Sequence, residues 1–320
     1  MRPALAVTGF LLKRLLFAAG TLLAVSLAVF AATEILPGDV AGAVLGQSAT
    51  PEALAALRAS MHLDLPASVR YLHWLGGMVT GDVGHSLVNN RPVSELIGSR
   101  LPNSLLLAGA ATAFCVPIGL LLGICSAMRP TSVFDRVTSV ATLSIVAVPE
   151  FFIGTLAVLV FAVNLRWFPA LTLSPRIDSV EGFFRSMTLP VLSLSGIIIA
   201  QIMRMTRAAL LDVLRRPYVE MARLKGVVGA RLVLFYALPN ALGPIANALA
   251  LSLSHLLGGA IIIETIFNFP GLAKLLVDAV STRDMPLVQA CTMLFCLAYL
   301  ILGTLADIAG MLANPRLRAS

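Results

Sequence analysis

The chain has 320 residues, of which 58% are hydrophobic and only 12% are charged, and its mean hydropathy is +0.92. A water-soluble domain of this length needs more charged residues to cover its surface, so the composition argues against a soluble globular protein. The 23 Lys and Arg exceed the 16 Asp and Glu and give a net charge of +7. Because these basic residues flank apolar runs, they indicate membrane topology rather than nucleic-acid binding.

Apolar runs of about 20 residues, the length that spans a bilayer core, recur along the chain. We expect six membrane spans, at about residues 15–35, 104–128, 137–165, 189–205, 238–267 and 287–311. The first run is longer than the core of a signal peptide, which favours an uncleaved span. Pro149 lies within the third run, and its missing backbone donor predicts a kink there. The predicted fold is an all-α polytopic membrane protein.

The distribution of Lys and Arg predicts the orientation of these spans. Six spans place both termini on the same side of the membrane. If that side is the cytoplasm, the inner segments carry 14 Lys and Arg and the outer segments nine, of which four lie in the long first loop. Basic residues near the ends of spans are retained in the cytoplasm, so we predict that both termini are cytoplasmic.

Cysteine and histidine positions do not indicate a disulfide or a metal site. All four cysteines lie inside predicted spans, and the ten residues from Cys115 to Cys125 correspond to roughly 15 Å along a helix, too far for a disulfide. Three of the four histidines lie in the first outer loop, away from the cysteines. We therefore expect no metal site in this chain.

Two segments outside the spans are long enough to hold structure of their own. Residues 37–102 form a long outer loop, in which Thr50 and Pro51 are typical of the start of a short amphipathic helix. Residues 207–239 form an inner loop that we expect to be helical, then to turn where Gly226 and Gly229 allow positive φ, and then to be helical again. Because this inner loop shows both apolar and charged side chains to the cytosol, it is a candidate docking element.

The spacing within the inner loop closely resembles the EAA-x3-G-x9-I-x-LP loop of permease subunits in binding-protein-dependent ABC importers. The matching residues are Glu220, Met221, Ala222, Gly226, Tyr236, Leu238 and Pro239. Met221 stands where the family usually has Ala, and Tyr236 where it usually has Ile, and both replacements keep apolar bulk.

Four further segments are similar to the dipeptide, oligopeptide and nickel class of these permeases and extend the likeness over nearly the whole chain. They are the sequences LPGD at residues 36–39, GDVGHS at 81–86, ETIF with PGL at 264–272, and RDMP at 283–286, where the family has RDYP.

This resemblance implies a single transmembrane domain over residues 1–320 in a bacterial-type inner membrane, with residues 207–239 forming a cytoplasmic coupling helix between the fourth and fifth spans. It also implies the partners: a second permease, expected to be a paralogue, two ATPase subunits and an extracytoplasmic substrate-binding protein, with membrane lipid around the spans and no nucleic acid. The chain has no G-x-x-x-x-G-K-[ST] phosphate loop, so we expect no cofactor here, and ATP and Mg to be bound by the ATPase subunits.

Four acidic residues are further candidates for function. Glu150 and Glu264 are the carboxylates expected at membrane depth, where they could border the passage and meet a substrate amino group or metal cation, or could simply pair at a helix end. Asp39 and Asp82 lie in the outer loop, where they could shape a landing site for a binding protein, although a structural role in a turn is the favoured interpretation.

Other classes of membrane protein fit parts of the sequence. A secondary transporter driven by an ion gradient would also have Pro- and Gly-interrupted spans with rare buried acids, but we find no inverted internal repeat. An intramembrane hydrolase could use His255 with Ser252 or Ser254, but the G-x-S-x-G turn is absent. We therefore expect a non-catalytic permease, whose solute (a di- or oligopeptide, nickel, glutathione or another) the sequence does not identify.

Overall fold

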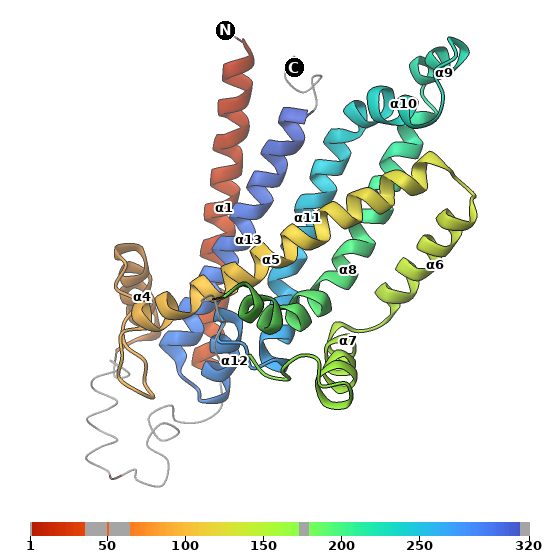
Figure 1. Ribbon diagram of the computed structural model, residues 1–320. Coiled ribbons are helices and arrows are strands. Elements are labelled where there is room, and N and C mark those ends of the chain that lie inside the picture. Colours follow the sequence, from red (N-terminus) through yellow and green to blue (C-terminus); the bar gives the residue numbers. More distant parts are fainter. Residues whose placement is uncertain (1, 36–49, 51–64, 173–178, 314–320) are drawn as a thin grey trace. The chain divides into compact units, whose positions relative to one another are not determined.

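The computed structural model describes residues 2–35, 50, 65–172 and 179–313 (Figure 1). The chain forms two compact units. Unit 1 comprises Met1–Leu12, Leu105–Phe269 and Tyr299–Ser320, and unit 2 comprises Lys13–Ser104 and Pro270–Ala298. The predicted helix that begins at Thr50 and Pro51, and Asp39 with its LPGD segment, lie outside the described residues apart from Thr50 itself.

Almost all described residues that have regular structure are helical, as the sequence predicted. In chain order the helices are α1 (Arg2–Ile35), α4 (Ala67–Thr80), α5 (Val93–Met128), α6 (Val133–Ala147), α7 (Glu150–Ala157), η2 (Val158–Asn164), α8 (Val180–Leu214), α9 (Pro217–Leu224), α10 (Gly229–Leu232), η3 (Val233–Ala237), α11 (Leu238–Ile266), α12 (Leu272–Ser281) and α13 (Met285–Ala313). The two η elements are π-helical stretches.

Five helices are long and apolar enough to cross a membrane, and the third predicted span differs from them. It is divided into α6 and the α7–η2 pair, which meet at an angle of 98°, so the count is five or, if the bent pair is one span, six. Proline disfavours helical geometry in the preceding residue, and Val148 is extended, with φ −96° and ψ 129°. The kink predicted at Pro149 is therefore confirmed, and it is a sharp break.

The ends of the other spans differ from the prediction mainly in α5 and α8. Helix α5 begins at Val93 and continues through Pro102, where we expected the outer loop to end, and α8 extends well beyond both ends of the predicted apolar run. Polar residues at these ends remain helical because backbone hydrogen bonding continues past the apolar core. Helices α4 and α12 were not predicted.

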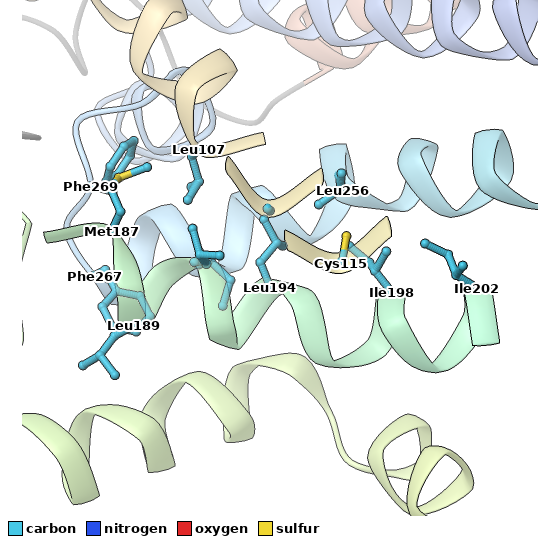
Figure 2. Close-up of a cluster of buried hydrophobic side chains, with 13 residues drawn as sticks. Leu107, Cys115, Met187, Leu189, Leu194, Ile198, Ile202, Leu256, Phe267 and Phe269 are labelled. Atoms are coloured by element: carbon cyan, nitrogen blue, oxygen red, sulfur yellow. The ribbon is translucent and has the colours of Figure 1, made fainter. Parts of the chain in front are cut away.

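The core of unit 1 is formed by α5, α8 and α11. Figure 2 shows Leu107 and Cys115 from α5 beside the long row of α8 side chains from Met187 to Ile202, with Leu256 from α11. Two glycines allow α5 to approach α8 closely. A Cβ added to Gly119 would lie 2.8 Å from Ile202 Cβ, and one added to Gly123 would lie 2.7 Å from Thr206 Cβ. These glycines, four residues apart, match the small-residue spacing common where membrane helices touch.

Unit 2 is held together by aromatic packing and by contacts between distant segments. Phe30 of α1 packs edge-on against Tyr71 of α4, with ring centroids 5.4 Å apart, and Trp74 lies beside both rings. The side-chain amide of Asn103 donates to the carbonyl of Pro270 at 2.8 Å. Helix α12 buries an apolar face within the unit.

A buried carboxylate also connects two of the family-like segments, GDVGHS and RDMP, in unit 2. The hydroxyl of Ser86 donates to Asp284, and the backbone N–H of Leu87 donates to the same carboxylate at 3.1 Å. Asp284 is only 1% exposed, so these bonds compensate for its removal from water. The GDVGHS and RDMP segments are therefore in contact, which the sequence did not predict.

Candidate functional site: the α9 surface and the buried acidic groups

Helix α9 is a short helix that follows α8 directly and lies next to α10 (Figure 1). Arg216 precedes it in extended geometry, and Pro217 stands at its first position, where a missing N–H costs nothing. Val219 and Ala222 are 0% and 5% exposed and pack in a cluster with Leu210 and Val213 of α8. The helix is therefore fixed to unit 1 through its small buried face.

Gly226 ends α9 in a specific turn. Its φ is +85°, in the left-handed region that favours glycine. The N–H of Val227 donates to the carbonyl of Ala222 at 3.1 Å, and the N–H of Gly226 donates to that of Arg223 at 2.9 Å. This is the Schellman pattern of helix termination. The positive φ expected at Gly226 and at Gly229 (φ +63°) is confirmed.

The opposite face of α9 is apolar and exposed. Tyr218, Met221 and Leu224, three residues apart on the helix, are 45%, 56% and 77% exposed. Together these three residues form what we call the α9 stripe. Glu220 is exposed beside the stripe. Large apolar side chains grouped on an exposed helix face are typical of a surface that contacts another protein.

The other predicted loop residues lie at the start of the fifth long helix. Tyr236 is exposed in η3, Leu238 is the half-buried first residue of α11, and Pro239 is exposed within its first turn. Proline is tolerated there because the first turn of a helix needs no intrahelical donor. In the last turn of α8, Asp212 accepts a 2.8 Å hydrogen bond from Arg216, and this bond raises the pKa of the Arg216 guanidinium.

An ion pair that the sequence did not predict lies close to this loop. Arg207 of α8 donates to both carboxylate oxygens of Asp135, through Nε at 2.5 Å and Nη2 at 2.8 Å. Asp135 is 3% exposed and also accepts from the Ser126 hydroxyl and from the N–H of Thr131 at 2.9 Å. This network joins the α5–α6 turn to α8 one element before α9.

The two acidic residues proposed for the passage differ in environment. Glu150 is the first residue of α7 and half-buried, and its Oε2 would lie 2.9 Å from a Cβ added to Gly259, so the carboxylate contacts α11. His255 is near enough to interact with it electrostatically. Glu264 is fully buried in unit 1 and interacts with a neighbouring group, and its carbonyl accepts from Phe269 N–H at 2.8 Å.

Asp82 lies in the outer segment of unit 2. Its carboxylate accepts a 3.2 Å hydrogen bond from the N–H of Gly84. Gly81 and Gly84 on either side have φ values of +86° and +78°. This arrangement is an Asx turn, which favours the structural interpretation of Asp82 over direct contact with a binding protein.

The serines of α11, in unit 1, bear on the hydrolase alternative. The hydroxyls of Ser252 and Ser254 donate to carbonyls of their own helix, those of Ala248 and Ala250, at 2.9 and 3.0 Å. This is the usual state of a structural serine in a helix rather than of an activated nucleophile. Among the described residues, no three His, Cys, Asp or Glu side chains are grouped closely enough to hold a metal ion.

Comparison with known proteins gives the family. The model of the binding-protein-dependent transport system inner membrane component matches residues 117–319, and the model of the N-terminal part of such membrane components matches residues 7–108. The chain therefore belongs to this family of inner-membrane permease subunits of ABC importers.

Curated relatives match this chain over nearly its full length. A "Putative peptide transport system permease protein" of Brucella abortus is 37% identical, with 98% of this chain and 99% of the relative covered. Glutathione transport system permease protein GsiC of Salmonella typhi is 36% identical, with 97% and 98% covered. A solved chain of the MetNI methionine ABC transporter has a TM-score of 0.47 at 19% identity and covers 71% of this chain and 93% of that one.

Proposed function

We propose that this permease forms half of the translocation pathway of an ATP-driven importer and couples that pathway to cytosolic ATPase subunits through α9. The observation that carries the proposal is the α9 stripe. One face of the helix is fixed to unit 1 by Val219 and Ala222, and the other presents Tyr218, Met221 and Leu224 to solvent. A helix fixed in this way can transmit a rigid displacement from a partner to the spans.

Within this proposal the family-like residues have separate roles. Glu220, exposed beside the stripe, pairs with a basic group of the ATPase, while Met221 contacts it directly. Ala222 is small enough for α9 to lie against α8, and Gly226 closes the turn that sets the direction of the helix. Tyr236, Leu238 and Pro239 define where α11 begins. The whole of residues 1–320 acts as one transmembrane domain in this account.

The proposed partners are a second permease, two ATPases and an extracytoplasmic binding protein. The ATPases would bind ATP and Mg, because this chain has no phosphate loop of the Walker type. The excess of Lys and Arg in the inner segments supports an orientation with both termini and α9 in the cytoplasm. The solute is proposed to be a peptide or a related small solute, since relatives are named for peptide and glutathione transport.

Glu150 is proposed to border the passage. A half-buried carboxylate at a sharp break between α6 and α7, placed against α11, can meet a cationic group of the solute. Glu264 remains a weaker candidate, because its side chain is fully enclosed in unit 1. Glu150→Gln should raise the KM for uptake of a cationic solute in an assembled transporter, with Glu181→Gln, an exposed carboxylate in α8, as control. Unchanged uptake in the Glu150 variant would remove this role.

The test of the proposed function is reconstitution. A tagged permease should co-purify with ATPase subunits, and proteoliposomes holding the complete assembly should show solute uptake that needs ATP and is blocked by vanadate. A secondary transporter is the alternative, and it would instead move solute when this chain is reconstituted without any ATPase and an ion gradient is imposed. Uptake of that second kind would refute coupling through α9.

A further inference from the structure

The ends of α5 and α8, the α5–α6 turn, Arg223 of α9 and the helix α10 border an open hollow of about 460 Å³ in unit 1. This size is within the range of roughly 300–1,000 Å³ typical of small-molecule pockets. Three arginines, Arg207, Arg215 and Arg223, line it together with apolar side chains that include Leu211, Leu214 and Leu232. All of its lining residues are described, and none of them is Asp or Glu.

The positive charge in this hollow is only partly neutralised. Arg207 is held by Asp135, and the nearby Asp212 is engaged by Arg216, which does not line the hollow. Within the described part of the chain, no carboxylate forms an ion pair with Arg215 or Arg223. The hollow therefore concentrates cationic donors that match the planar, bidentate recognition of phosphate.

The position of the hollow indicates where the phosphate comes from. It is lined by Ala127 and Met128, at the end of the apolar helix α5, and by Arg207, which follows the predicted apolar run of α8 (residues 189–205) by two residues. The ends of such spans lie at the depth of the lipid headgroups, and basic pockets between spans on the cytoplasmic side are typical headgroup sites. Leu211 and Leu214 on α8 provide an apolar wall that the glycerol and the first part of an acyl chain would contact. A free phosphate ion would leave this wall without a partner.

We propose that this hollow binds the headgroup phosphate of an anionic phospholipid through Arg215 and Arg223. The proposal rests on the proposed function in one respect, the cytoplasmic orientation of α9. A bound lipid would join the end of α8, which carries Arg215, to α9, which carries Arg223. Lipid composition would thus affect the connection between α8 and α9, through which α9 is proposed to move the spans.

The test compares lipid binding by the purified full-length chain with and without the two arginines. Native mass spectrometry would count bound phosphatidylglycerol and phosphatidylcholine on wild-type protein, on Arg215→Gln/Arg223→Gln, and on the control Lys225→Gln/Arg231→Gln, which loses the same charge at exposed positions outside the hollow. Each arginine near the membrane surface contributes about fivefold to the affinity for anionic lipid, so the first double variant should bind phosphatidylglycerol about 30-fold more weakly. The control should bind as the wild type does.

Several results would overturn the proposal. Equal loss of binding in both double variants would mean that net charge, not the hollow, attracts lipid. Displacement of phosphatidylglycerol by inorganic phosphate at low millimolar concentration would identify the ligand as the free ion. If Arg215→Gln/Arg223→Gln lowered the affinity for purified ATPase and left lipid binding unchanged, the hollow would receive an acidic segment of that protein. Because lipid binding is measured without ATPase, failure of the coupling proposal would leave this result intact.

Discussion

Replacing Gly226 should loosen α9 in proportion to the cost of left-handed geometry in the new residue. The φ of +85° costs an ordinary residue about 1–2 kcal/mol, costs Asn less, and costs a β-branched residue the most. No atom lies within 4 Å of a Cβ built on Gly226, so crowding adds nothing to this cost. We therefore expect losses of turn stability below 1 kcal/mol for Asn, about 1 for Ala and about 2 for Val.

Amide hydrogen exchange measures this turn directly, because the N–H of Val227 is bonded to Ala222. Peptides covering residues 222–228 should exchange about fivefold faster in Gly226→Ala and about 30-fold faster in Gly226→Val, and ATPase co-purification should fall in the same order. Gly76→Ala, at an uncrowded helical position in α4, is the control and should change neither. An exchange rate in Gly226→Val equal to that of the wild type would refute the claim that the left-handed turn holds α9 in place.

Three further predictions concern the packing and the buried polar groups. Gly123→Val should lower the free energy of unfolding by about 1–3 kcal/mol, because the added side chain forces α5 away from α8. The control is Gly109→Val on the same helix, where the side chain meets open space. Equal losses of thermal stability in the two variants would contradict the close approach of α5 to α8. Arg207→Ala should lower the free energy of unfolding by about 3 kcal/mol, because it leaves the buried Asp135 carboxylate without its cation. Asp135→Asn should cost less, because it leaves no buried anion. A double-mutant cycle that shows no coupling between the two positions would exclude the network. Ser86→Ala should lower the free energy of unfolding by about 1–3 kcal/mol, because it removes a hydrogen bond to the buried Asp284 carboxylate. Asp82→Ala should cost less, because Asp82 is exposed. The reverse order of stabilities in denaturant unfolding would disprove this ranking.

Apolar length predicted the helices best where the apolar run covers nearly the whole helix. The predicted limits of the fifth and sixth spans agree with α11 and α13 to within two residues at each end. The method failed for α5 and α8, whose polar ends carry no apolar signal but continue the backbone hydrogen bonding. Apolar length also gives no indication of α12, which is too short to span a membrane, whereas the helical spacing of Leu272, Leu275, Leu276 and Ala279 does indicate it.

The local geometry of the site was more predictable than its long-range contacts. Gly226 and Gly229 were assigned to a turn because glycine is the residue that adopts positive φ without strain. The pairing of Arg207 with Asp135 joins residues 72 positions apart, and that of Ser86 with Asp284 joins residues 198 apart. A single sequence contains no periodic signal for such pairs. Even where both partners lay in family-like segments, as Ser86 and Asp284 did, their contact emerged only from the fold.

The most direct test of the central claim is the affinity of purified ATPase subunits for a permease whose α9 stripe is made acidic. Met221→Glu/Leu224→Glu alters two exposed side chains and leaves the buried Val219 and Ala222 in place, so the fold should persist. The matched control is Val79→Glu/Val88→Glu, at exposed apolar positions of unit 2. The account predicts at least a tenfold loss of ATPase affinity, and loss of energised uptake, in the stripe variant alone. Affinity and uptake equal to those of the control would contradict it.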